Sequence, residues 1–129
     1  HGIALGTFLL CCCDYRIGVK GEFMLGANEM RTNMVIPTPI LELIKFRVNE
    51  SHKYRAVLGA EMYTLEKAQE AGLIDEVVSS EDLMKTALEK AKDLQTMGHP
   101  SYTITKELFI AEPMSKINEA MKEYKNNGK

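Results

Sequence analysis

The chain has 129 residues, of which 45% are hydrophobic and 26% charged, with a net charge of −2. These values are typical of one globular domain or part of one, and the lack of a basic excess argues against a nucleic-acid partner. No apolar run approaches the ~20 residues that a membrane-spanning helix needs. The three cysteines, at positions 11–13, lack the spacing of a zinc site or a disulfide framework.

Two features of the sequence indicate the cellular compartment and whether the chain is part of a longer protein. The adjacent cysteines favour buried thiols in a reducing compartment, so we expect the cytoplasm or an organelle matrix, mitochondrial or peroxisomal in a eukaryote. The chain opens at His1 in an apolar stretch without a targeting signal. We therefore expect it to be the C-terminal part of a longer protein.

The first predicted element is a short helix. A loop of small residues, 4–7, leads directly into the apolar run 8–13, which should be buried on all sides but could be helix or strand by periodicity alone. The small residues ahead of the run favour a helix. Its first N–H groups, on Leu5 to Thr7, would then be free to bind a ligand.

Two short strands and a long loop come next. Alternation predicts strands over 14–19 and 23–25, with Gly26 ending the second. Two such strands cannot form a stable sheet by themselves, so we expect their partners to lie outside this chain. Residues 27–39 show no clear period, and regular structure is not expected until Pro39 can open a helix. A long loop with this apolar content is more often functional than idle.

The rest of the chain is predicted to be mainly helical. Apolar residues at helical spacing mark a helix over 40–48, and capping residues or glycines bound helices at 52–58, 64–71 and 80–97. An extended segment covers 73–78, two further helices cover 102–111 and 114–125, and the polar tail 126–129 should fray. We divide this single domain into residues 1–39, which carry the candidate loops, and a helical region over 40–129.

Glu29 is the strongest candidate for catalysis. It lies in the long loop among apolar neighbours such as Leu25 and Met34, and burying an acid in apolar surroundings is a common way to prepare a general base. The apolar run 8–13 offers no second acid to share a two-proton reaction. A single carboxylate can take a proton from one carbon and return it to another, which favours isomerisation over hydration. By contrast, His52 and His99 are predicted to be surface residues.

Two segments carry a family resemblance. The first is A-L-G-T-F-L-L-C-C-C-D-Y-R-I, residues 4–17, followed by G-A-N-E at 26–29, and the second is A-Q-E-A-G-L-I-D-E-V-V, residues 68–78. Together they resemble the C-terminal half of the crotonase (enoyl-CoA hydratase/isomerase) superfamily, over essentially the whole chain. The resemblance implies an α/β fold of repeated ββα units with a helical C-terminal region, and assembly into homotrimers or pairs of trimers.

The resemblance also implies roles for individual residues. Family members hold the thioester oxygen of an acyl-CoA between two backbone N–H groups, and the one on this chain would be that of Leu5, beside Gly6. Family hydratases carry two glutamates, and this chain matches the second at Glu29 but has Phe8 in place of the first, a pattern similar to Δ3,Δ2-enoyl-CoA isomerases. Two family glycines are replaced: Leu5 then needs a negative φ, and Asn33 can adopt the left-handed conformation better than most residues.

We therefore expect an enzyme of fatty-acid metabolism that moves one proton. Glu29 would take a proton from C2 of a 3-enoyl-CoA and return it at C4, while the Leu5 N–H and a second donor outside this chain hold the thioester oxygen. Neither a metal nor a redox cofactor is implied. Coenzyme A enters as part of the substrate. Beside Gly6, the expected substrate-binding residues of the acyl pocket are Thr7, Phe8, Met34, Ile36 and Pro37.

Two alternatives stay open. The first is a hydratase or another crotonase chemistry whose additional group comes from outside this chain. The second is a non-catalytic acyl-CoA-binding or assembly subunit. Made alone, the 129 residues are expected to be inactive and poorly soluble, because half of the site would be missing and the early strands would present unpaired edges.

Overall fold

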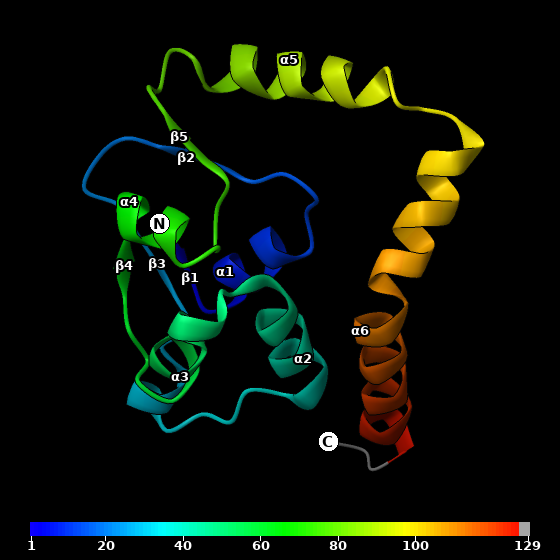
Figure 1. The fold of residues 1–129 in the computed structure, drawn as a ribbon. Coiled ribbons are helices and arrows are strands. Elements are labelled where there is room, and N and C mark those ends of the chain that lie inside the picture. The colour runs from blue at the N-terminus through cyan, green and yellow to red at the C-terminus, as the bar shows by residue number, and fades with distance from the viewer. Residues whose placement is uncertain (127–129) are drawn as a thin grey trace.

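The computed structural model describes residues 1–126 and combines short strands with helices. The strands are β1 (Gly2–Ile3), β2 (Ile17–Val19), β3 (Met24–Gly26), β4 (Tyr63–Thr64) and β5 (Glu76–Val78). The α-helices are α1 (Leu5–Cys11), α2 (Thr38–Arg47), α3 (Lys53–Val57), α4 (Leu65–Glu70), α5 (Leu83–Gln95) and α6 (Pro100–Asn126), with 3₁₀ helices η1 (Glu29–Thr32) and η2 (Glu50–His52). Figure 1 shows the strands gathered with α1–α4, while α5 leads away to α6, which stands beside α2.

A hydrophobic core joins α1, α2 and the strands. Among its largest fully buried side chains are Tyr63 of β4, Ile44 of α2, Cys11 of α1 and Ile74, which precedes β5. Ile44 and Val48 are the buried members of the stripe predicted over 40–48, so α2 packs on the core with the face that its sequence indicates.

The pairing of the strands differs from the prediction. The two early strands, β2 and β3, find partners within this chain: β2 pairs in parallel with β5, and β3 lies between β1 (parallel) and β4 (antiparallel). Both β4 and β5 come after residue 39, so the two predicted parts of the chain share their sheets. The sequence could not show this, because each strand is short and its partner is distant in the chain.

The strand predicted over 14–19 is shorter than expected. Only Ile17–Val19 forms β2, because the N–H of Arg16 donates to the carboxylate of Asp75, 2.8 Å away. The helix after the long loop starts at Thr38, one residue before Pro39, a difference within the usual variation of helix boundaries.

The prediction of two C-terminal helices is wrong. One helix, α6, runs through residues 100–126 with Pro113 inside it. A proline inside a helix costs about 3 kcal/mol, but α6 lies along α2, and this packing supports the helix on both sides of Pro113. Asn126, predicted to fray, is helical, and residues 127–129 of that tail lie outside the described residues.

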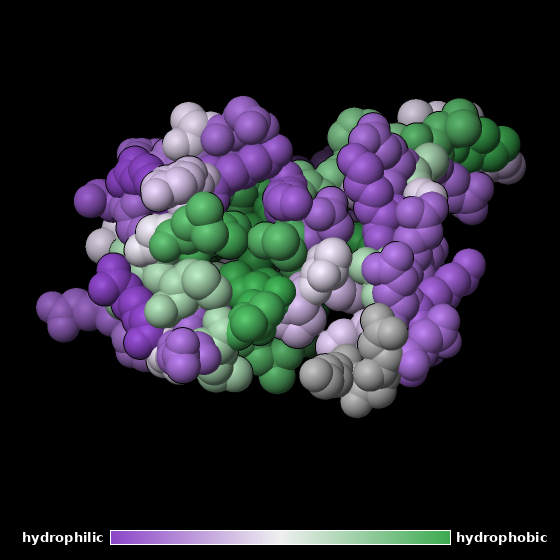
Figure 2. Space-filling view, turned by 90° about the horizontal axis from the view of Figure 1, so that it is seen from below, coloured by the Kyte–Doolittle hydropathy of each residue, from purple (hydrophilic) through white to green (hydrophobic). Residues whose placement is uncertain are grey.

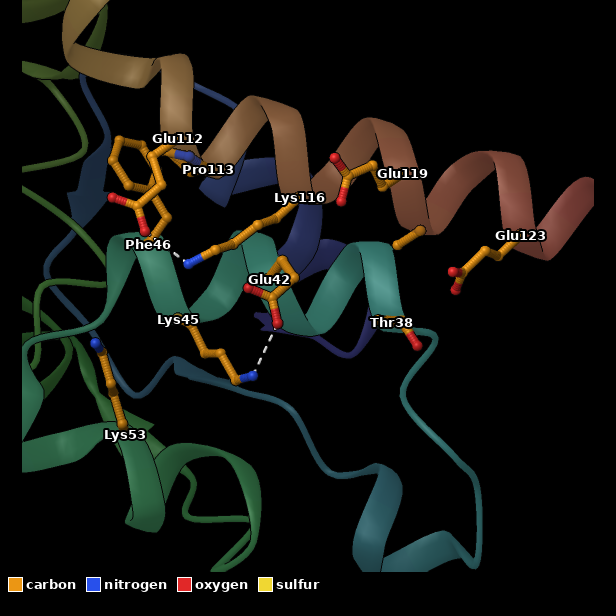
Figure 3. Close-up of a pocket in the computed structure, with 11 residues that line it drawn as sticks. Thr38, Glu42, Lys45, Phe46, Lys53, Glu112, Pro113, Lys116, Glu119 and Glu123 are labelled. Carbon is orange, nitrogen blue, oxygen red and sulfur yellow. Dashed lines mark hydrogen bonds and ion pairs between the residues drawn. The ribbon is translucent and has the colours of Figure 1, made fainter.

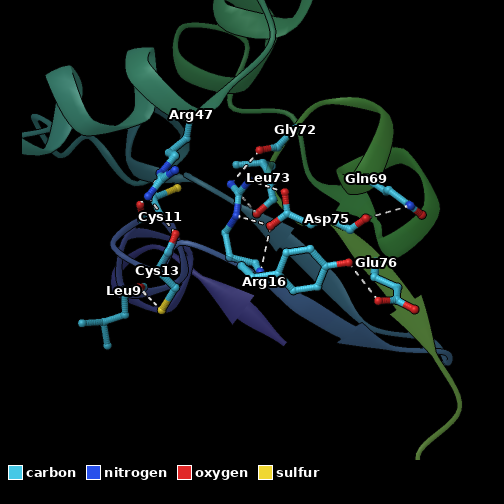
Figure 4. A network of polar contacts seen from close by, with 11 residues as sticks. Leu9, Cys11, Cys13, Arg16, Arg47, Gln69, Gly72, Leu73, Asp75 and Glu76 are labelled. Carbon is cyan, nitrogen blue, oxygen red and sulfur yellow. Dashed lines mark hydrogen bonds and ion pairs between the residues drawn. The ribbon is translucent and has the colours of Figure 1, made fainter. Parts of the chain in front are cut away.

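Arg47 of α2 closes the C-terminal end of α1 (Figure 4). Its Nε and Nη2 donate to the carbonyl oxygens of Cys11 and Cys13, each at 2.8 Å. A cation that binds the last carbonyls of a helix satisfies otherwise unpaired acceptors and complements the helix dipole. This contact therefore fixes α1 relative to α2.

The lower face of the molecule carries a hydrophobic area surrounded by hydrophilic residues (Figure 2). The loop between η1 and α2 lies at the bottom of Figure 1, and Figure 2 shows a broad hydrophobic area on that side. In this loop Met34 is 59% and Val35 86% exposed, and Met30 of η1 is 41% exposed. Apolar surface of this kind often marks contact with a ligand or partner.

Candidate functional site

The first part of the site is the junction between β1 and α1. Strand β1 ends at Ile3, which pairs with Gly26 of β3, and the N–H of Ala4 extends the pairing by donating to the carbonyl of Gly26 at 2.9 Å. Ala4 has φ 51° and ψ −116°, a conformation that non-glycine residues rarely adopt. This turn lets Leu5 begin α1 at once, so the N–H groups of its first turn have no acceptor within the helix.

Leu5 does not have a positive φ, as its position in place of a family glycine requires. It is the first residue of α1, and the positive φ falls on Ala4 instead. A leucine in the position of a family glycine is therefore compatible with this backbone.

The second part of the site is Glu29, which opens η1 three residues after β3 ends. Its side chain is only 5% exposed, and its Oε2 is buried without a hydrogen-bond partner in residues 1–126. An unpaired buried carboxylate oxygen is costly, so its retention points to a ligand or to chemistry.

The backbone of Glu29 is held firmly. Its carbonyl oxygen accepts hydrogen bonds from the N–H groups of Asn33 and Met34 and from the hydroxyl of Thr32. Asn33 adopts the left-handed conformation, φ 56° and ψ 37°, as its tolerance for that conformation predicted. From the same 3₁₀ helix, Arg31 donates through Nε to the carbonyl of Ala60 at 2.9 Å. The acid-bearing loop is therefore tied down within itself and to the turn before β4.

These two parts lie at the same end of the parallel pair β1–β3. Parallel neighbours bring the segments that come after them to one edge of a sheet, which is where ligands bind in many α/β proteins. Here one segment is the first turn of α1 and the other is η1 with Glu29. The geometry thus combines N–H donors that have no acceptor within their helix with a buried carboxylate.

The remaining predicted residues are spread over different environments. Phe8 and Ile36 belong to the hydrophobic core, each 6% exposed. Thr7 is buried, with its hydroxyl bonded to backbone groups. Met34 and Pro37 are exposed.

Gly6 lines a cavity of about 360 Å³ with mainly apolar neighbours, which include Leu10, Phe23, Leu25 and Leu65. The structure thus places Gly6, Thr7 and Phe8 around α1 and Met34, Ile36 and Pro37 along the loop after Glu29.

Some features near the site were missed by the sequence prediction. His52 is half-buried rather than a surface residue: its Nδ1 is buried without a partner in residues 1–126, and its ring lies 5.8 Å from that of Tyr63. The Tyr63 hydroxyl is likewise buried and unpaired among the described residues, and burial raises the pKa of this phenol. His99, in contrast, is exposed as predicted. An unusual φ or a partner from a distant strand leaves no local pattern, so Ala4 and His52 could not have been singled out.

A larger groove lies between α2 and α6, about 610 Å³ in volume, and is lined mostly by charged side chains (Figure 3). Lys45 pairs with Glu42 at 2.8 Å and Lys116 with Glu112 at 2.7 Å. These local pairs are of the kind that decorate solvated helix faces. The groove therefore offers no arrangement for catalysis comparable to that around Glu29.

Within residues 1–126, histidine, cysteine, aspartate and glutamate side chains do not gather in any group of three that could hold a metal ion. None of the helices in that range is both long and apolar enough to cross a bilayer.

Comparison with known proteins identifies the family. Residues 1–127 match the family described as enoyl-CoA hydratase/isomerase. The chain belongs to this family. Its α/β, crotonase-like fold is thereby confirmed, as is the resemblance noted in the sequence. No match was found among curated proteins.

Several solved structures of the family are similar to the chain. An enoyl-CoA hydratase/isomerase family protein from Pseudomonas syringae is 35% identical, with a TM-score of 0.92, over 98% of this chain and 55% of that one. The enoyl-CoA hydratase EchA3 from Mycobacterium ulcerans is 29% identical (TM-score 0.92), over 100% and 56%. An enoyl-CoA isomerase from Mycobacterium tuberculosis is 31% identical (TM-score 0.89), over 95% and 54%. The chain thus spans about half the length of these family members.

Proposed function

We propose that the full-length gene product is an acyl-CoA enzyme and that Glu29 moves a proton between C2 and C4 of a 3-enoyl-CoA. The Glu29 carboxylate takes the proton as the C2–H bond breaks; that electron pair forms a C1–C2 double bond, and the carbonyl pair moves onto the thioester oxygen to give a dienolate. When the carbonyl re-forms, the C1–C2 pair becomes the new C2–C3 double bond, and the pair of the old C3–C4 double bond takes the proton back from Glu29 at C4. The net change is a shifted double bond, so neither water nor a redox partner is consumed, and coenzyme A enters only as part of the substrate.

The observation that carries this proposal is that the segments directly after β1 and β3, the first turn of α1 and η1 with Glu29, lie at the same edge of the sheet. The carboxylate of Glu29 is buried, and its Oε2 has no hydrogen-bond partner among the described residues, which leaves it available as a base for a carbon acid. The N–H of Leu5 is a first-turn donor at the start of α1, where N–H groups can stabilise the oxyanion of a thioester enolate. A second donor, and the other walls of the site, would come from outside residues 1–126.

Phe8 favours isomerisation over hydration. Hydration needs a group to activate water and another to protonate carbon, whereas a proton shuttle needs one base. Phe8 is buried in the core and cannot transfer a proton. The names of similar proteins do not decide this point, because one relative is described as a hydratase and another as an isomerase.

The loop that carries Glu29 suits an apolar substrate. Its exposed side chains include Met30, Met34 and Val35. Burial of an acyl chain against such side chains is favourable at about 25 cal/mol per Å². We propose that Met34, together with Ile36 and Pro37 of the same loop, guides the acyl chain toward Glu29.

The test compares two reactions of the full-length gene product. We expect conversion of a 3-enoyl-CoA to the 2-enoyl-CoA, with little hydration of a 2-enoyl-CoA. Glu29→Gln, which keeps the size of the side chain, should lower the turnover number about 10²-fold or more. Glu22→Gln, an exposed glutamate before β3, is the matched control and should leave it unchanged.

The other outcomes are equally specific. Hydration without isomerisation would contradict the isomerase assignment and favour a hydratase with an additional group from outside this chain. Binding of acyl-CoA with no turnover of either substrate, unaffected by Glu29→Gln, would favour a non-catalytic subunit.

A further inference from the structure

Thr7 connects the two halves of the candidate site. It lies in the first turn of α1, two residues after Leu5, and only 2% of it is exposed. Its Oγ1 accepts the N–H of Gly26 at 2.9 Å and donates to the carbonyl of Gly2, with the carbonyl of Gly26 3.2 Å away as a second acceptor. One hydroxyl thus contacts the start of β1 and the end of β3 from the first turn of α1.

The position of this hydroxyl matters because β1 and β3 each lead directly into one half of the candidate site. Gly26 is the last residue of β3, three residues before Glu29. Its carbonyl also accepts the N–H of Ala4, the strained residue that sets the direction of α1. The contacts of Thr7 and Ala4 with Gly26 therefore set the distance between the first N–H of α1 and the loop that bears the acid.

The contacts also replace a missing sheet interaction. Beyond Ile3 and Gly26 the β1–β3 ladder ends, because the chain turns into α1. The N–H of Gly26 would be buried without a backbone acceptor, and a buried donor needs one. The hydroxyl of Thr7 supplies this acceptor from α1. The contact ties α1 to the sheet where the chain leads to the Leu5 N–H on one side and to Glu29 on the other.

We propose that Thr7 is a positioning residue, which holds the Leu5 N–H and the Glu29 carboxylate in register for one substrate. This inference rests on the proposed function of Glu29. A valine at this position would keep the shape and remove both the acceptor and the donor. Because small displacements of reacting groups can lower rates about 10²-fold, the effect of the hydroxyl should appear in the turnover number rather than in substrate binding.

The test uses the full-length gene product and three variants at this position. Thr7→Val should lower kcat about 10- to 100-fold with KM changed less than about threefold. Thr7→Ser, which restores the hydroxyl, should keep kcat within about twofold of the parent. Thr7→Cys, a weaker hydrogen-bonding group, should fall between them. The amide of Gly26 should exchange with solvent faster in the valine variant than in the serine variant.

A core variant separates positioning from stability. Ile44→Val removes one buried methylene from α2, a helix that contributes none of the candidate site residues, and should lower the melting temperature with kcat unchanged. If Thr7→Val melts before it can be assayed, the comparison of serine with cysteine decides. Equal kcat values for serine and cysteine, or a folded valine variant with the kcat of the parent, would overturn the positioning role.

Glu29→Gln, assayed beside these variants, distinguishes this inference from the proposed function. If Glu29→Gln keeps full turnover, the proposed function fails, and the positioning role fails with it. If Glu29→Gln is inactive while Thr7→Val is fully active, Glu29 keeps its proposed role and only the inference about Thr7 is wrong.

Discussion

The guanidinium of Arg16 and the carboxylate of Asp75 form a two-point ion pair, with Nε to Oδ2 and Nη2 to Oδ1 both at 2.9 Å (Figure 4). Nη1 of Arg16 also donates to the carbonyls of Gly72 and Leu73, at 2.7 and 3.2 Å. The two residues flank the parallel pair β2–β5, in which Ile17 is opposite Glu76. The two segments that carry the family resemblance, residues 4–17 and 68–78, are therefore one structural unit.

Removing Arg16 should destabilise this unit strongly. The arginine is 7% exposed, and Arg16→Ala would remove both guanidinium hydrogen bonds to Asp75 and the donor to two carbonyls. We expect a loss of about 3 kcal/mol in the free energy of unfolding, measured by denaturant titration. The exposed pair Lys116–Glu112 is the control, and Lys116→Ala should leave the midpoint nearly unchanged. Equal effects of the two variants would contradict a special role for the β2–β5 pair.

Asn33 should be replaceable by glycine but not by alanine. Its left-handed backbone places two N–H groups on the carbonyl of Glu29, and alanine in that conformation costs about 1 kcal/mol. We expect Asn33→Ala to lower the melting temperature and to reduce the turnover number severalfold. Asn33→Gly should leave both unchanged. If alanine and glycine behave alike in both measurements, the acid loop does not depend on this conformation.

How much the sequence could predict depends on the range of the interactions. Helix α1, the acid loop and the helical stripe of α2 arise from local patterns, and the motif around Glu29 identified the acid that the structure buries. The pairing of β2 with β5 was missed, because Arg16 and Asp75 are far apart in the sequence and the strands have only three residues each. The role of the Thr7 hydroxyl likewise depends on Gly26, a residue that local pattern does not connect to it.

Pro113 shows the opposite error, a local signal overridden by packing. Two helices were predicted, over 102–111 and 114–125, yet α6 continues through Pro113 against α2. Pro113→Ala should therefore restore a helical hydrogen bond and stabilise the fold by about 1–3 kcal/mol, measured by thermal melting. Glu107→Ala, at an exposed position of the same helix, should have almost no effect. A lower melting temperature for Pro113→Ala would mean that the proline is needed for the packing on α2.

Stability should decline at alkaline pH partly because of Cys11. Burial raises the pKa of this thiol from 9.0 to about 11, so the folded state holds the proton after the unfolded chain has lost it. Its contribution is full below pH 9, falls between pH 9 and about 11, and is then lost, a change of at most ~3 kcal/mol. Cys11→Ala cannot ionise here, so its stability should fall less steeply over this range. Parallel pH profiles for parent and variant would contradict this assignment.

Transfer of an isotope label within the substrate tests the central claim most directly. A 3-enoyl-CoA carrying deuterium at C2, converted by the full-length gene product, should yield 2-enoyl-CoA with a substantial share of that deuterium at C4, because one carboxyl group, that of Glu29, removes and returns it. Product whose C4 carries only solvent hydrogen, formed as fast by Glu29→Gln as by the parent, would contradict a proton shuttle at Glu29.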